Sequence, residues 1–152
     1  MSAIDAQEDL PALRLTRLLP ASPERVFDAW TDPESVAVWM CDGTTTVASV
    51  ELDVRVGGQF RVVMRGTESD HVHSGEYREI RRPDRLVFTW TSSGTEGKET
   101  LVTLDFVARG KGTELRLTHE LLPSQDAADK HQGGWTSIFD KLAAYLDALV
   151  RH

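Results

Sequence analysis

The spacing of apolar residues changes along the chain and marks different kinds of element. From residue 44 to residue 122, apolar and polar residues alternate, as Phe60, Val62 and Met64 do with their neighbours. A period of two is typical of β-strands with one buried face. The alternating runs follow one another across short polar or glycine-containing links, which favours an antiparallel meander. A similar run over residues 13–18 predicts an earlier first strand.

Two short helices are predicted between this first strand and the meander. Ser22 followed by Pro23 suits a helix N-cap and the first helical position, and Asp32 followed by Pro33 repeats the signal. The first of these helices carries Val26, Phe27 and Trp30 on one face, and the second carries Val36, Trp39 and Met40. Both helices are therefore expected to bury one side.

A helical period of 3.6 returns after Pro123 and predicts a long C-terminal helix. Its apolar stripe is formed by Trp135, Ile138, Phe139, Leu142, Leu146 and Leu149. Gly133 and Gly134 lie within this helix, and each glycine lowers helix stability by ~1 kcal/mol relative to alanine. Bare backbone at this point would serve either a close approach to a strand or room for a ligand.

The order of elements predicts an α+β domain over residues 13–152, after a flexible tail over residues 1–12. A curved antiparallel sheet of six or seven strands would wrap around the C-terminal helix, the one element long and apolar enough to cover it. The aromatic side chains of the strands should then face Trp135 and Phe139. These strand residues are Phe60, Phe88, Trp90 and Phe106.

The composition of the chain bears on its binding partners and its cellular location. A net charge of −7 on 152 residues removes the usual electrostatic footprint of a nucleic-acid-binding protein. Cys41 is the single cysteine, so an intramolecular disulfide is impossible. The N-terminus lacks a signal pattern, and no apolar run approaches the ~18 residues that a membrane helix needs. We expect a cytoplasmic protein without membrane insertion, either a monomer or a homodimer.

Five stretches together resemble the START-like (SRPBCC) superfamily, and within it the branch named for the activator of the heat-shock protein 90 ATPase. They are residues 23–34 followed by Trp39, then 54–60, 75–80, 83–90 and 133–135. The resemblance implies a helix-grip fold with a hydrophobic cavity. Members of the superfamily include lipid and hormone binders, polyketide cyclases and uncharacterised bacterial proteins.

The favoured function is the binding of a small hydrophobic or aromatic molecule between the sheet and the C-terminal helix. A cyclase or aromatase that uses the same cavity is the first alternative. The second is a protein-interaction module that activates a chaperone ATPase, less favoured because few residues precede the first strand. The predicted ligand-binding residues are Trp39, Phe60, Val62, Met64, Tyr77, Phe88, Trp90, Leu104, Phe106, Leu117, His119, Trp135, Ile138, Phe139 and Leu142.

A few polar residues could act within such a cavity. His119 could bond a ligand or move a proton, although we favour a core-edge histidine bonded to backbone or water. Tyr77 could orient a polar ligand group or simply form an aromatic wall, and Glu79 on the same strand face could be a base or an arginine partner. His71 and His73 have a metal-chelating spacing but lack evident further ligands. We therefore predict neither a metal nor a cofactor.

Overall fold

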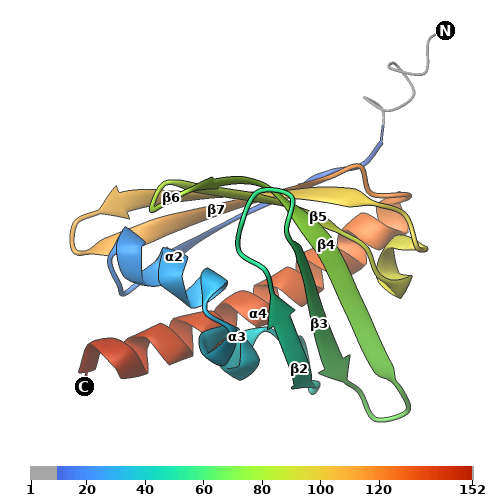
Figure 1. The fold of residues 1–152 in the computed structure, drawn as a ribbon, viewed down its shortest axis with the longest axis horizontal. Coiled ribbons are helices and arrows are strands. Elements are labelled where there is room, and N and C mark those ends of the chain that lie inside the picture. Colours follow the sequence, from blue (N-terminus) through green and yellow to red (C-terminus); the bar gives the residue numbers. More distant parts are fainter. Residues whose placement is uncertain (1–9, 152) are drawn as a thin grey trace, which may run out of the picture.

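Seven antiparallel strands form one curved sheet around a long C-terminal helix (Figure 1). This computed structural model describes residues 10–151, so residues 1–9 of the predicted tail lie outside the described residues. The strand order is β1-β7-β6-β5-β4-β3-β2. The strands are β1 (Leu13–Leu19), β2 (Thr46–Leu52), β3 (Gln59–Arg65), β4 (Asp70–Arg81), β5 (Arg85–Trp90), β6 (Thr100–Arg109) and β7 (Gly112–Glu120). The α+β helix-grip prediction is confirmed.

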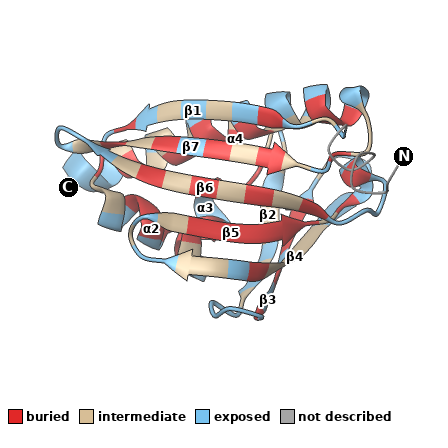
Figure 2. Ribbon diagram, turned by 90° about the horizontal axis from the view of Figure 1, so that it is seen from above, coloured by how far each residue is buried: buried red, intermediate tan, exposed pale blue. Residues whose placement is uncertain are grey.

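One edge strand, β1, pairs with a strand that is distant from it in sequence. β1 pairs with β7, with Leu15 opposite Leu117, whereas the six later strands pair in chain order. A short 3₁₀ helix, η1 (Ser93–Thr95), lies in the loop between β5 and β6. Figure 2 shows that β5, near the middle of the sheet, is buried along almost its whole length.

The two short helices form where the cap signals predicted them. They are α2 (Pro23–Thr31) and α3 (Pro33–Trp39). The Ser22 hydroxyl accepts a hydrogen bond from the Arg25 amide at 3.4 Å, and the Asp32 carboxylate accepts one from the Glu34 amide at 3.3 Å. Each side-chain oxygen thus satisfies an amide that the first helical turn leaves without a partner.

The C-terminal helix α4 (Gln125–Arg151) is 27 residues long and passes through the two glycines without a break. A β-carbon on Gly133 would meet nothing within 4 Å, and one on Gly134 would meet only the Asp42 side chain, at 3.4 Å. Neither glycine approaches a strand this closely, so the explanation by close strand packing is wrong. The open space beside the helix fits the other explanation.

The sheet aromatics pack mainly against the short helices and one another. Trp90 meets Trp135 of α4 with ring centroids 5.0 Å apart, as predicted. Phe106, however, packs on Phe27 of α2 at 5.2 Å. Phe60 lies 5.3 Å from Phe88, and Phe88 packs on Trp30 at 6.4 Å. The prediction that Phe60, Phe88 and Phe106 face Trp135 and Phe139 is therefore wrong. The physical reason is that α2 and α3 enter between the sheet and α4, on the same side of the sheet (Figure 1).

A β-bulge in β4 corrects the prediction that Tyr77 and Glu79 share a face. Tyr77 pairs with Phe88, whereas Glu79 pairs with Val87, its neighbour on the opposite face of β5. The extra residue at Arg78 inverts the alternation of side chains. Tyr77 is buried in the core, and Glu79 pairs with Arg81 at 2.7 Å.

Candidate functional site

An open hollow of about 510 Å³ lies between α2, α3 and the end of α4. Two cavities closer to the sheet differ greatly in size. The smaller, of about 20 Å³, lies in the apolar interior beneath the short helices. It is lined by Trp30, Val36 and Met40 of the α2–α3 segment on one side and by Phe60 and Phe88 of the sheet on the other. This volume holds about one water molecule. The interior that the sequence predicted as a ligand cavity is thus occupied by the protein's own side chains.

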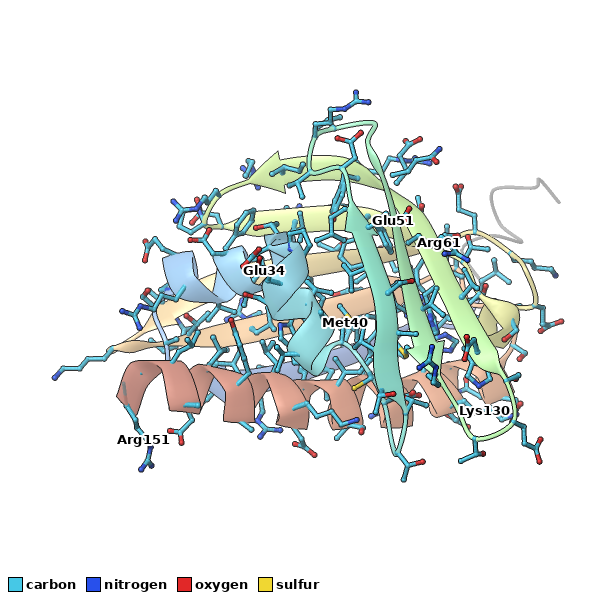
Figure 3. The ribbon with its side chains drawn as sticks, turned by 60° about the horizontal axis from the view of Figure 1, so that its bottom comes forward. Glu34, Met40, Glu51, Arg61, Lys130 and Arg151 are labelled. Atoms are coloured by element: carbon cyan, nitrogen blue, oxygen red, sulfur yellow. The ribbon has the colours of Figure 1, made fainter. Side chains whose placement is uncertain are left out.

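The larger pocket has a volume of about 290 Å³ and lies beside the first half of α4. Met64, His71 and His73 of strands β3 and β4 form one wall. Register explains their common direction, because Met64 pairs with His71 and Val62 with His73. Lys130 of α4, labelled in Figure 3, also lines this pocket.

Three further segments complete this pocket. Asp42 and Thr45 contribute from the loop between α3 and β2, and Ser92, Ser93 and Gly94 contribute from η1 and the residue before it. From α4, the lining residues are Lys130, His131, Gly134, Trp135 and Ile138. Because Gly134 has no side chain, the helix leaves open a volume that a larger residue would occupy.

Two tryptophans form the apolar floor of the pocket. Trp90 of β5 and Trp135 of α4 lie with ring centroids 5.0 Å apart and planes at 49°. The His73 ring covers another part of Trp90, at 4.9 Å and 36°. Tilted rings of this kind pack favourably, and both tryptophans are almost fully buried beneath the pocket.

A directed chain of hydrogen bonds holds this floor in place. The Trp135 indole N–H donates to His119 Nδ1 at 3.0 Å, so Nε2 must carry the imidazole hydrogen. His119 Nε2 then donates to the Thr100 hydroxyl at 2.7 Å, and that hydroxyl donates to the Trp90 carbonyl at 2.6 Å. Every N–H and O–H donor in the chain is used. The chain connects α4 to β5, β6 and β7 directly behind the pocket.

His119 itself is buried, and this burial, with His131 as a lesser cause, lowers its pKa to about 3. A neutral imidazole is the state that the hydrogen-bond chain requires, since it needs one donor and one acceptor nitrogen. The predicted core histidine is therefore bonded to two side chains instead of backbone or water. His119 does not line either cavity.

His73 lines the pocket and, unlike His119, has a ring nitrogen without a hydrogen-bond partner among the described residues. Burial lowers its pKa to about 4, an effect that the Asp42 carboxylate partly opposes. The nitrogen without a partner is Nδ1, and it is buried. A buried polar atom without a partner is uncommon and costs free energy.

His131 is one of the pocket residues that the sequence analysis missed. Its Nδ1 donates to the Ala127 carbonyl at 2.8 Å, one helical turn earlier. Its ring stands edge-on to His119, at 5.0 Å and 88°. The available signal was its spacing of four from Trp135, which places both on one face of a helix. It was missed because the apolar stripe begins only after the two glycines.

The predicted binding residues divide into three groups in the structure. Met64, Trp90, Trp135 and Ile138 line the larger pocket. Phe60, Val62, Tyr77, Phe88 and again Trp90 line the small interior cavity. The others are buried in the core: Trp39, Leu104, Phe106, Leu117, His119, Phe139 and Leu142. Ligand contact by any of these residues stays a prediction.

A metal site would need a cluster of side chains that could bind the ion. Among residues 10–151, no group of three or more histidine, cysteine, aspartate or glutamate side chains is placed to hold a metal ion. His71 and His73 line the pocket as a pair from one strand.

The curved antiparallel sheet, the covering C-terminal helix and the two short helices after the first strand define a START-like protein of the helix-grip class. Residues 20–147 match the family model described as "Activator of Hsp90 ATPase homolog 1-like protein". The chain therefore belongs to this family. A comparison with curated protein sequences finds no match. No helix within the described part of the chain has the length and apolar character needed to span a bilayer.

Solved structures of bacterial proteins share this fold over nearly the whole chain. Protein CV1439 of Chromobacterium violaceum is 28% identical, with 90% of this chain and 97% of that chain covered and a TM-score of 0.80. An uncharacterised protein of Rhizobium leguminosarum is 27% identical, with 92% and 96% covered and a TM-score of 0.75. SA2116 of Staphylococcus aureus, 20% identical, has 95% and 98% covered and a TM-score of 0.81, and so supports the fold alone.

Proposed function

We propose that this protein binds a small, flat and largely apolar molecule in the pocket between strands β3 and β4, η1 and the first half of α4. The observation that carries the proposal is the pocket of about 290 Å³ above the paired rings of Trp90 and Trp135. This volume is near the lower end of the ~300–1,000 Å³ of small-molecule sites. An aromatic floor with a few polar groups around it is also typical of such sites.

The pocket differs from an ordinary surface hollow in that its floor is rigidly held. The His119 chain holds the Trp135 indole and ends at the Trp90 backbone carbonyl, through three hydrogen bonds of 2.6 to 3.0 Å. A preformed surface lowers the ordering cost of binding. The affinity would come mainly from apolar area removed from water, at ~25 cal/mol per Å².

The test is a screen of fused-ring aromatics, flavonoids and fatty acids by thermal shift and native mass spectrometry. A ligand present at 100 times its Kd stabilises the folded state by about 2.7 kcal/mol, which raises the melting temperature measurably. We expect fused-ring aromatics to give this shift. A screen in which none of the three classes binds would remove the proposal.

Two neighbouring glycines provide matched variants that locate the binding. Gly134→Leu places a side chain in the pocket, whereas Gly133→Leu places the same side chain where a β-carbon meets nothing within 4 Å. Binding should be lost in the first variant and kept in the second. Equal binding by both variants would mean that the ligand occupies another place.

An enzymatic role is the second candidate, and His131 favours it. An imidazole whose Nδ1–H is held by a backbone carbonyl presents its other nitrogen as a base, and His131 has this arrangement. A cyclase of reactive ketide chains would use it to remove a proton. Identical product mixtures from a ketide substrate with and without the protein would exclude this role. Chaperone ATPase activation stays a hypothesis, to be tested by adding the protein to the chaperone and measuring ATP hydrolysis.

A further inference from the structure

Resting on the proposed function, we infer that the ligand is a hydroxylated aromatic molecule whose hydroxyl group donates a hydrogen bond to His131 Nε2. The inference starts from the tautomer of His131. A carbonyl oxygen only accepts hydrogen bonds, so the 2.8 Å contact with the Ala127 carbonyl places the hydrogen on Nδ1. In the neutral ring Nε2 is then an acceptor.

The position of Nε2 makes this acceptor available to a ligand. Nδ1 is turned toward the helix backbone, so Nε2 lies on the opposite edge of the ring, and His131 lines the pocket. Gly94 lies beside this part of the ring. A β-carbon added to Gly94 would lie 3.5 Å from His131 Nε2 and 3.2 Å from Cε1. Bare backbone at Gly94 leaves this edge of the ring uncovered. Within the described residues, no hydrogen bond reaches Nε2.

The other polar groups of the pocket favour a neutral donor over an acid. The Asp42 carboxylate lines the opposite side, with one oxygen 3.2 Å from the Thr45 hydroxyl and the other beside Gly134. A ligand carboxylate would meet this negative charge and the lone pair of His131. The Gly94 amide is already used by the Ser92 hydroxyl at 3.1 Å. Lys130 pairs with Asp126 at 3.1 Å.

Binding of three probes with the same ring system tests the inference by isothermal titration calorimetry. They are 2-naphthol, which can donate a hydrogen bond, 2-methoxynaphthalene, which cannot, and 2-naphthoate, which is negatively charged. We expect 2-naphthol to bind about tenfold more tightly than its methyl ether, the difference that one hydrogen bond supplies. The carboxylate should bind more weakly than 2-naphthol.

Variants then identify the acceptor. His131→Leu removes it, and Gly94→Ala covers it while keeping the imidazole, so the second variant also serves if the first folds poorly. The difference between naphthol and ether should fall to within about twofold in both variants. Gly133→Ala, whose new methyl group meets nothing within 4 Å, should keep the full difference.

The possible failures are distinct. Equal affinity of the wild-type protein for 2-naphthol and its ether would overturn the hydroxyl inference and leave the proposed function standing. A tenfold difference that persists in Gly94→Ala and His131→Leu would also overturn it, because another residue would then accept the bond. If no naphthalene probe binds the wild-type protein, the proposal of an aromatic site falls together with the inference.

Discussion

Two regions on the same side of the sheet differ in what covers them. Under α2 and α3, Trp30, Val36 and Met40 reach into the interior and leave about 20 Å³. Beside the first half of α4, Gly134 and the short η1 loop leave about 290 Å³. Strands β3, β4 and β5 contribute side chains to both regions. The difference shows that the covering elements, more than the sheet, decide where this domain keeps space for a ligand.

The two regions also hold their tryptophans by different means. The indole N–H groups of Trp30, Trp39 and Trp90 have no hydrogen-bond partner among the described residues, whereas that of Trp135 is bonded to His119. The closed region thus depends on shape and apolar contact. In the open region the hydrogen-bond chain holds the Trp135 indole, whereas the Trp90 ring, which lines both regions, is held by packing.

The largest effect should come from emptying the closed region. Trp30→Ala removes a buried ring that contacts Trp39, Phe88, Trp135 and Phe139. We expect a loss of about 3–5 kcal/mol in the free energy of unfolding, measured by urea denaturation. Val38→Ala on exposed α3 surface is the control and should change it by less than about 0.5 kcal/mol. A loss below about 1 kcal/mol for Trp30→Ala would mean that the interior is not tightly filled.

A smaller effect should appear in the pH dependence of stability. His119 and His73 have pKa values lowered to about 3 and about 4, whereas both would titrate near 6.5 in the unfolded chain. The unfolded state therefore binds more protons below pH 6.5, and the free energy of unfolding falls as the pH falls from about 6.5 to about 4. Each histidine contributes a limiting slope of ~1.4 kcal/mol per pH unit.

The variant His119→Gln isolates one of these contributions. Carboxylates and the other histidines affect both proteins alike, so the difference between the two stability curves reports His119. We expect a shallower decline in the variant between pH 6 and pH 4.5, from urea denaturation at each pH. Parallel curves would contradict the neutral, buried state of His119 and with it the hydrogen-bond chain behind the open pocket.

The smallest effect separates the two glycines of α4. Gly133→Ala should raise the free energy of unfolding by about 0.5–1 kcal/mol, because alanine favours the helix and its methyl group meets nothing within 4 Å. Gly134→Ala should gain no more than this and should weaken aromatic binding, since its methyl group enters the pocket beside Asp42. Thermal unfolding and titration of 2-naphthol measure both effects. Equal effects of the two substitutions on binding would contradict the position of the pocket.

Much of the fold was predictable because its signals are local. The cap residues Ser22 and Asp32 and the alternation of the strands act within a few positions, and both outcomes are confirmed. The direction of Glu79 was not predictable, because a bulge at Arg78 depends on pairing with β5. The aromatic partners of Phe60 and Phe106 depend on how α2 and α3 enter the space under the sheet.

The candidate site was less predictable, because it is assembled from segments far apart in the sequence. Asp42, Gly94 and His131 come from two loops and a helix, and no local pattern shows that they meet. Sequence reasoning did predict that Trp90 faces Trp135, and room for a ligand was one of its two explanations of the glycines. It placed the ligand space along the whole helix, whereas Trp30, Val36 and Met40 leave little space in the interior.

The central claim is that ligands occupy the open pocket and not the interior, and the four tryptophans report on both. The most direct measurement is a ¹H–¹⁵N NMR titration of the indole N–H signals with 2-naphthol. The structure predicts the largest shift for Trp135, with Trp90 next, and little change for Trp39. Larger shifts for Trp39 and Trp30 than for Trp135 would place the ligand in the interior and contradict the account.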